Sequence, residues 1–334
     1  MKTSIKLLTL FMRCSCGTAQ KKQVEWHPIV QKAKETSLYT NQVKWKKVNQ
    51  EFIALTKDKT NIEGFKEGLQ FLINSLGDKH ASFRLLTDHS IVASYTGKLE
   101  PEDPERDTEF LTSVINDISA KFSYQLLDNK VGYLRVVGIG PGDVKKQADL
   151  IRNGLKTLKE KGANKWIVDL RYNGGGNIEP MVSGLAPLIG EGFIGGAINA
   201  QNEIRDYTIK KAQLYNYERL ACAMDDQPNI RATEKVAVLL SRYTISSGEM
   251  LAITFKGRSN TKFIGEKTAG YTTGNGYDII SDELAMIISQ DIFIDRNKKS
   301  YDQHVGVDVA IPFQHHIPMA NDNQINHAIT WLNK

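Results

Sequence analysis

The spacing of apolar residues differs between the first quarter of the chain and the remainder. From about Trp26 to Leu76, apolar residues recur every three or four positions, in NQVKWKKVNQEFIALT and again in IEGFKEGLQFLINSL, and Gly77 follows. This spacing predicts amphipathic helices, and the glycine predicts the end of the last one. We therefore expect a small N-terminal helical unit over residues 21–77.

From Lys130 onward, apolar runs that read as strands alternate with helical segments. Strands are predicted in VGYLRVV, KWIVDLRY, FIGGAI, KVAVLL and KFIGE, and helices in DVKKQADLIRNGLKTLKEKG, around Glu179–Ile189 and in DNQINHAITWLNK. Two hairpin-like strands are expected around Tyr277–Phe293, and a loop-rich insertion over about 201–234. The alternation predicts an α/β (α+β) fold, with a core of mixed β-sheet and crossover helices over residues 130–334.

The intervening segment, residues 78–129, is polar for much of its length. It carries an acidic run from Glu100 to Glu109 and one short helical pattern near Phe110–Phe122. We expect a histidine-containing loop followed by a small cap or connector.

The extreme N-terminus has the features of a signal peptide. It has a basic start, an apolar run from Ile5 to Met12 and small residues before Gln20. The run is too short to span a bilayer, so no stable membrane span is expected. We predict removal of residues 1–20 and export to the periplasm, the cell surface or the medium. Cys14 and Cys16 fit a lipoprotein acceptor poorly, and lipid anchoring is the minority alternative.

Composition narrows the class of protein. The values of 41% hydrophobic and 24% charged residues are ordinary for a folded soluble protein of this length, 334 residues. The formal net charge of +5 falls to +2 without Lys2, Lys6 and Arg13, and no basic stripe argues for nucleic acid. Only Cys222 would remain in the mature chain, and the seven histidines show no paired spacing. We expect no disulfide framework, no metal site and no cofactor.

The stretch DLRYNGGGN, Asp169 to Asn177, follows a predicted buried strand. Three consecutive glycines let the backbone approach a ligand and present amide donors, although a merely flexible loop is the simpler alternative. No Gly-Lys-Ser/Thr follows, which argues against a phosphate loop, and a dinucleotide fingerprint is absent.

A second candidate is Ser246 in VAVLLSRYTISSGEML. Ser246 and Glu249 have the spacing of a capping box at a helix start. A strand-to-helix turn is also a suitable place for a nucleophilic serine, because the helix amides lie close by. Two further candidates are His80 in GDKHASFR and the loop GEKTAGYTTGN, residues 265–275.

Together these four stretches resemble the tail-specific, or C-terminal processing, family of serine peptidases, and within it the nisin-resistance branch. The resemblance covers roughly Gly77 to Ile311. It implies that Ser246 is the nucleophile, that His80 is the general base, and that the amides of Gly175 and Ser247 form the oxyanion hole. Gly176, Glu249 and Asp295 are implied as supporting residues, and Thr268 and Gly270 as substrate-binding residues.

Two departures from the family pattern matter. Many members carry a catalytic lysine where this chain has Tyr271, and a tyrosine with a pKa near ~10 is a poor base at neutral pH. We therefore favour a Ser-His pair over a dyad with Lys267. The residue that orients His80 is left open among Asp78, Ser82, Glu249 and Asp295. The segment between Arg84 and Lys130 is too short for a PDZ domain, so none is expected.

The resemblance implies a serine endopeptidase that hydrolyses exported peptides or unfolded proteins near their C-termini through an acyl-enzyme. A catalytically weak relative that only sequesters peptides is one alternative, and a dedicated lantibiotic-resistance peptidase is another. The sequence leaves the oligomeric state open.

Overall fold

The computed structural model describes residues 27–97, 121–225, 227–315 and 317–334. The predicted signal peptide and the acidic run lie outside the described residues. The helical pattern near Phe110–Phe122 also lies outside them, except for its last two residues.

Three helices form the N-terminal unit: α1 (His27–Thr36), α2 (Trp45–Thr56) and α3 (Ile62–Leu76). Helix α3 begins where the Asn61 side chain accepts a hydrogen bond from the Gly64 amide, and it ends at Gly77, which has a φ of +67°. Glycine readily adopts this left-handed conformation. Because α3 ends at Gly77, the predicted helix end is confirmed. One face of α3 packs into a cluster that includes Phe52 of α2 and Ile29 of α1.

A six-stranded sheet forms the centre of the core, in the order β14-β11-β10-β5-β4-β3. Its strands are β3 (Ser123–Leu127), β4 (Val131–Arg135), β5 (Lys165–Asp169), β10 (Val236–Leu240), β11 (Thr261–Gly265) and β14 (Val309–Ala310). Only β3 pairs in antiparallel fashion, and the other strands are parallel to their neighbours. Parallel sheets need crossover connections, which the alternating sequence pattern predicted.

Helices cover both faces of this sheet. Val236, Val238 and Leu240 of β10 pack in the cluster formed with α5 (Val144–Glu160), α6 (Ile178–Ile189) and α7 (Ser247–Phe255). Ala237 and Leu239 point to the opposite face, where α8 (Asn323–Asn333) packs. Because both faces of β10 are buried, the strand reads in the sequence as a continuous apolar run.

A second, antiparallel sheet has the order β2-β1-β13-β6-β7-β8-β9, with β12 paired to β13. Its strands are β1 (Ser82–Leu85), β2 (Ile91–Ser94), β6 (Gly192–Asn199), β7 (Ile204–Lys210), β8 (Gln213–Asn216), β9 (Arg219–Leu220), β12 (Thr273–Ile279) and β13 (Leu284–Asp295). Strands β7 to β9 lie inside the segment predicted as loop-rich, so that prediction was wrong there. They are partly exposed, with one buried position in each of β7 and β8 and none in β9, and therefore lack an apolar run.

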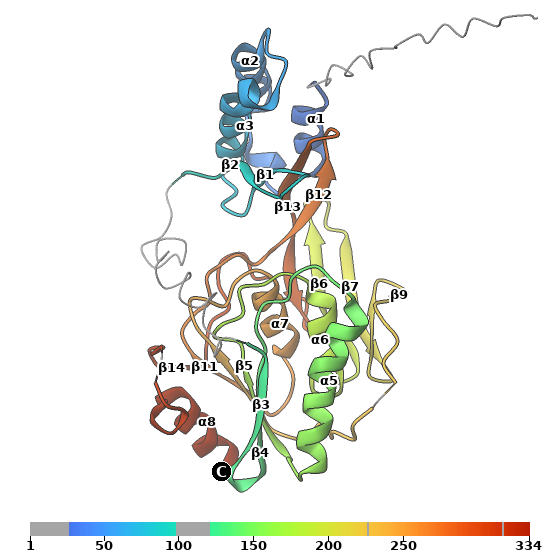
Figure 1. Cartoon of the computed structure of the whole chain (residues 1–334), viewed down its shortest axis with the longest axis vertical. Coiled ribbons are helices and arrows are strands. Elements are labelled where there is room, and N and C mark those ends of the chain that lie inside the picture. The colour runs from blue at the N-terminus through green and yellow to red at the C-terminus, as the bar shows by residue number, and fades with distance from the viewer. Residues whose placement is uncertain (1–26, 98–120, 226, 316) are drawn as a thin grey trace, which may run out of the picture.

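Strand β13 connects the helical unit to the core. Its first residues pair with β1, and residues 291–295 pair with β6. Leu284, Met286 and Ile288 of β13 belong to the same apolar cluster as the buried face of α3. In Figure 1 the β12–β13 hairpin runs from the three helices at the top toward the core below. The hairpin therefore sets how the N-terminal unit lies on the core.

Candidate active site

Ser246 lies in the connection between β10 and α7, immediately before the first residue of the helix. Its backbone has φ +53° and ψ −120°, which is unusual for a residue with a side chain. Such strain persists where neighbouring contacts fix the backbone, and it clusters at functional sites. Here the Ile245 amide donates to the Asn173 carbonyl at 2.9 Å, and the predicted capping box with Glu249 is present.

Asn173, which lies between Tyr172 and the three glycines, holds the glycine loop against the serine turn. The residue is fully buried, and its Oδ1 accepts a hydrogen bond from the Gly175 amide at 3.0 Å. Its Nδ2 donates to the Val136 carbonyl at 3.1 Å, just beyond β4. Because the Asn173 carbonyl also accepts from the Ile245 amide, this one residue joins the segments that follow β4, β5 and β10. The sequence analysis included Asn173 in the family pattern but assigned it no role.

The glycine loop and the serine turn are in direct contact. A Cβ atom placed on Gly175, whose φ is +96°, would lie 2.9 Å from the Ser246 Cβ and 3.2 Å from the Ser247 nitrogen. The Ser247 hydroxyl donates to the Gly176 carbonyl at 2.6 Å. The structure therefore brings together Ser246, Ser247, Gly175 and Gly176.

The two predicted oxyanion donors differ in their present partners. Ser247 is the first residue of α7, and a residue in that position has an amide without an acceptor within its own helix. The Gly175 amide already donates to Asn173 Oδ1 and would have to share its hydrogen with an oxyanion. The oxyanion role of both amides stays a prediction.

Replacing Gly175 with alanine is expected to displace the serine turn and lower peptidase activity by roughly 100-fold or more, as for a lost oxyanion donor. The added methyl would meet the Ile245 carbonyl and the Ser246 Cβ, both at 2.9 Å. Activity is measured with a peptide substrate and folding by thermal unfolding. Gly190→Ala is the matched control, since Gly190 has a φ of +97° but no atom within 4 Å of an added Cβ. Equal activity losses in the two variants would show that backbone strain alone is responsible.

Glu249 ties the serine turn to the loop that follows β11. Its Oε2 accepts from the amides of Ser246 at 3.0 Å and Tyr271 at 2.7 Å. Its Oε1 accepts from the Gly270 amide at 2.8 Å and from the Thr268 hydroxyl. Burial raises the pKa of Glu249 to about 7, although these four hydrogen bonds act in the opposite direction. Glu249 is thus a buried brace as well as a helix cap.

Thr268 and Gly270 contribute to that brace. The Thr268 hydroxyl also accepts a hydrogen bond from the Val305 amide at 2.8 Å, and its side chain is buried. These contacts place both residues beside the serine turn. Their predicted role in binding substrate stays a prediction.

His80 lies in the turn between α3 and β1. Its amide donates to Asp78 Oδ1 at 3.0 Å, and its ring Nδ1 lies 3.0 Å from Thr273 Oγ1 on β12. Burial, together with the positive charge of Lys79, lowers the pKa of His80 to about 4. The imidazole is therefore neutral at pH 7 and can accept a proton.

The segments of His80 and Ser246 converge at Tyr271. The His80 and Tyr271 rings meet edge to face, with centroids 5.3 Å apart. The Tyr271 amide shares Glu249 Oε2 with the Ser246 amide, so the histidine turn and the serine turn lie on either side of one buried residue. Lys79 also lies here, with its Nζ 4.1 Å from the centre of the Tyr271 ring, whereas Lys267 is exposed.

The four candidates for orienting His80 have other partners. Ser82 Oγ accepts from Arg84 Nε, and Asp295 accepts from the Asn297 and Lys299 amides and from the Tyr301 hydroxyl. Glu249 binds as described above, and Asp78 binds the His80 amide rather than the ring. The residue that contacts the ring nitrogen is Thr273. The sequence analysis included it in the candidate loop 265–275 but assigned it no role, whereas the structure places it at the start of β12.

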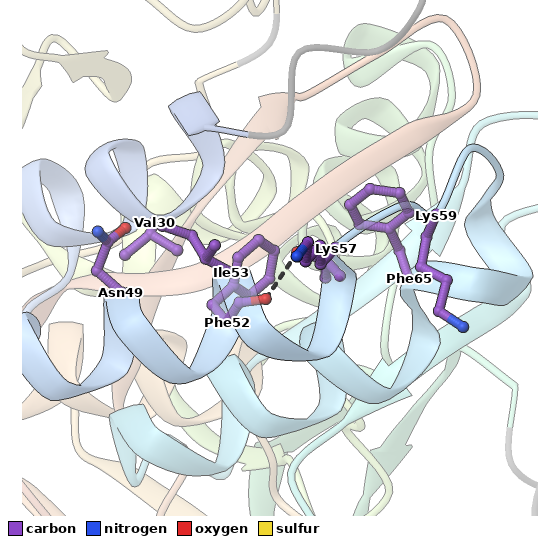
Figure 2. Close-up of a pocket in the computed structure, with 8 residues that line it drawn as sticks. Val30, Asn49, Phe52, Ile53, Lys57, Lys59 and Phe65 are labelled. Atoms are coloured by element: carbon purple, nitrogen blue, oxygen red, sulfur yellow. Dashed lines mark hydrogen bonds between the residues drawn. The ribbon is translucent and has the colours of Figure 1, made fainter.

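A cavity of about 220 Å³ lies on the N-terminal helical unit. Figure 2 shows its lining, which includes Val30 of α1, Phe52 and Ile53 of α2, and Phe65 of α3. None of the lining residues belongs to the glycine loop or the serine turn, so this cavity is separate from the candidate site.

Over the described ranges, no cluster of histidine, cysteine and acidic side chains could hold a metal ion. In that same part of the chain, no helix has the length and apolar character of a membrane span.

Several known proteins are similar to this chain. A family model described as Peptidase family S41 matches residues 130–312. The nisin-resistance protein of Lactococcus lactis subsp. lactis is 27% identical over 304 residues, which cover 89% of this chain and 83% of that protein.

Two solved structures share the fold. One is a lipoprotein from Streptococcus agalactiae, with a TM-score of 0.68 and 21% identity, covering 92% of this chain and 94% of that one. The other is a photosystem II D1 C-terminal processing protease, with a TM-score of 0.55 and 15% identity, covering 84% and 90%. The predicted α/β peptidase fold and the resemblance to C-terminal processing peptidases are confirmed.

Proposed function

Because the chain belongs to peptidase family S41, a family of serine proteases, we propose that it is an endopeptidase whose nucleophile is Ser246 and whose general base is His80. The observation that carries the proposal is the convergence of the strained serine turn, the glycine loop and a neutral, partly buried histidine around Glu249 and Tyr271.

The chemistry is acyl transfer to water. His80 takes the hydroxyl proton of Ser246 while the serine oxygen bonds to the substrate carbonyl carbon, and the carbonyl oxygen becomes an oxyanion. The amides of Ser247 and Gly175 stabilise that oxyanion, each contributing about 3 kcal/mol in comparable sites. The carbon–nitrogen bond then breaks as the imidazolium returns the proton to the leaving amine. His80 then takes a proton from a water molecule while the water oxygen bonds to the ester carbon. The imidazolium returns that proton to Ser246 as the acid product leaves.

The proposed substrates are exported peptides or unfolded proteins, cleaved near their C-termini. The predicted signal peptide supports export, and the similarity to a nisin-resistance protein supports a lantibiotic as one candidate substrate. The alternative proposal is a relative that binds peptides without cutting them, for which Tyr271 in place of a lysine is the supporting feature.

Covalent labelling by a fluorophosphonate separates the enzyme from the binding protein, because only an activated serine reacts. We expect one adduct on the intact protein, mapped to Ser246 by peptide mass spectrometry, and none on Ser246→Ala. An unlabelled folded protein that still binds peptides would support the sequestering alternative.

Substrate class is tested by incubation with nisin and, separately, with a denatured protein, followed by mass spectrometry of the products. Cleavage of nisin alone supports the dedicated resistance peptidase. Cleavage of both near their C-termini supports general processing, and internal fragments throughout would contradict C-terminal specificity.

The pH dependence of kcat/KM is expected to show an acid limb near pH 4 rather than near 6.5. The free enzyme needs neutral His80, and burial plus the charge of Lys79 lower its pKa to about 4. His80 therefore stays neutral as pH falls from 7 to 5, and the activity that depends on it is lost through about 4. Lys79→Met should move this limb to higher pH, because removing the nearby cation favours the imidazolium. An acid limb near 6.5 that shifts in Lys79→Met, with no limb near 4 in the unmodified protein, would contradict the lowered pKa assigned to His80.

A further inference from the structure

A buried chain of polar groups leads away from His80 into the β12–β13 hairpin. It consists of Thr273 on β12, Ser289 on β13 and Asp78 in the turn after α3, with exposed fractions of 7%, 0% and 1%. Buried polar groups are expensive unless they are hydrogen-bonded, so a chain of this kind is kept only with its partners in place.

The links are all of hydrogen-bonding length. His80 Nδ1 lies 3.0 Å from Thr273 Oγ1, which lies 2.8 Å from Ser289 Oγ, which in turn lies 2.9 Å from Asp78 Oδ1. Asn275 Oδ1 is a more distant alternative acceptor for Ser289 Oγ, at 3.4 Å.

Counting hydrogens gives the chain a direction. Asp78 already accepts from two backbone amides, that of Ser289 at 2.8 Å and that of His80 at 3.0 Å. Burial raises the pKa of Asp78 above its usual value, and the hydrogen bonds from these amides and from the Ser289 hydroxyl act in the opposite direction. Both carboxyl oxygens accept amide hydrogens, an arrangement that favours a carboxylate. A carboxylate has no hydrogen to give, so the single hydroxyl hydrogen of Ser289 points to Asp78.

The remaining links then follow in order. Ser289 Oγ, having donated its hydrogen, accepts that of Thr273, and Thr273 Oγ1 accepts the hydrogen on His80 Nδ1. The second ring nitrogen, Nε2, then carries the lone pair. In a Ser-His pair this is the tautomer in which the nitrogen that takes the serine proton is free to accept it.

We infer that Asp78, Ser289 and Thr273 are positioning residues that hold His80 in the Nδ1–H tautomer, with Asp78 acting on the ring through two hydroxyl groups rather than by direct contact. The inference rests on the proposed function, since it assigns these residues to the base of that same site. No proton needs to travel along the chain during the reaction. The two hydroxyls only fix which nitrogen is protonated and how the ring is turned.

Activity measurements on three variants test this chain of hydrogen bonds. Thr273→Val removes the hydroxyl but keeps the branched shape, and Ser289→Ala cuts the link to Asp78 while its backbone amide still donates to the carboxylate. We expect each to lower kcat by roughly 10- to 100-fold with little change in KM, as for the loss of groups that orient a functional imidazole. Thr273→Ser keeps the hydroxyl and should retain most of the activity.

Nitrogen NMR of the imidazole supplies a measurement that a purely structural role would not change. In the Ser246→Ala background, ¹⁵N shifts assigned by their loss in His80→Gln should show hydrogen on Nδ1, and Thr273→Val or Ser289→Ala should populate the Nε2–H form. An Nε2–H ring with the chain intact would overturn the inference, as would unchanged kcat and unchanged shifts in both variants.

The tautomer is read without substrate turnover, so the two proposals fail separately. Retained cleavage by Ser246→Ala would refute the proposed function, whereas an Nε2–H ring would refute the positioning role alone. If Thr273→Val fails to fold in a thermal unfolding experiment, Ser289→Ala decides the matter.

Discussion

Replacing Ser246 with alanine is expected to lower kcat/KM for peptide cleavage by roughly 10⁴- to 10⁶-fold, the loss that removal of a nucleophilic serine causes in comparable enzymes. The serine oxygen forms the bond to the acyl group, and the Ser247 hydroxyl cannot replace it because it donates to the Gly176 carbonyl at 2.6 Å. Alanine has a Cβ like serine, so the backbone strain at φ +53° is unchanged and the fold should persist. Turnover is measured with a quenched peptide, and folding by circular dichroism.

Ser247→Ala is the matched control for this substitution. It removes a neighbouring hydroxyl but keeps the amide that is proposed to bind the oxyanion, so its activity should stay within about 10-fold of the unmodified protein. Turnover retained by Ser246→Ala, or abolished equally by both substitutions, would contradict the assignment of the nucleophile.

The largest stability effect is expected at Arg171. Its guanidinium binds Asp169 through Nη2 at 2.7 Å and Asp322 through Nη1 at 2.6 Å, and all three side chains are buried. Asp322 is in turn the N-cap of α8. Arg171→Met leaves two buried carboxylates without their shared cation, and we expect the free energy of unfolding to fall by about 3–5 kcal/mol. Chemical denaturation followed by circular dichroism measures the change.

The pH dependence of this loss has a definite sign. Burial alone would raise the pKa of Asp169, but Arg171, together with Arg135 and Tyr133, holds it below its usual value. A carboxyl group with a lowered pKa in the folded state contributes stability above its unfolded pKa of ~3.9, and that contribution is lost as pH falls. The difference between Arg171→Met and the unmodified protein should therefore be largest near neutral pH and shrink in acid.

An exposed ion pair supplies the control for Arg171. Lys145 binds Asp149 at 2.9 Å on the surface of α5, where solvent screens the pair. Lys145→Met should change the free energy of unfolding by less than about 1 kcal/mol. Equal losses in the two variants would show that burial of the Arg171 network has no special importance.

The parts of the fold that the sequence predicts are those with strong local periodicity. Strand β10 and helix α3 are examples, because one is buried on both faces and the other carries a continuous apolar stripe. Strand β7 was missed because it is partly exposed, and its pairing with β6 depends on residues distant from its own pattern.

The features of the candidate site also differ in how far the sequence predicts them. The glycine loop and the serine turn were predicted together, and they lie in contact. The side-chain hydrogen bond between Thr273 and Ser289 was not predicted, because it depends on register in the β12–β13 hairpin. A bulge between Gly274 and Asn275 shifts the pairing by one residue, and a shift of this kind cannot be inferred from strand periodicity.

Strand β13 has a consequence for how a substrate could control its own cleavage. The proposed base belongs to the turn that leads from α3 into β1, the proposed nucleophile belongs to the core, and one twelve-residue strand pairs with both parts. A change in the tilt of this hairpin would therefore change the distance between the His80 imidazole and the Ser246 hydroxyl. A long peptide that contacts both the N-terminal helical unit and the core would keep that distance fixed, whereas a short peptide would leave it free to vary.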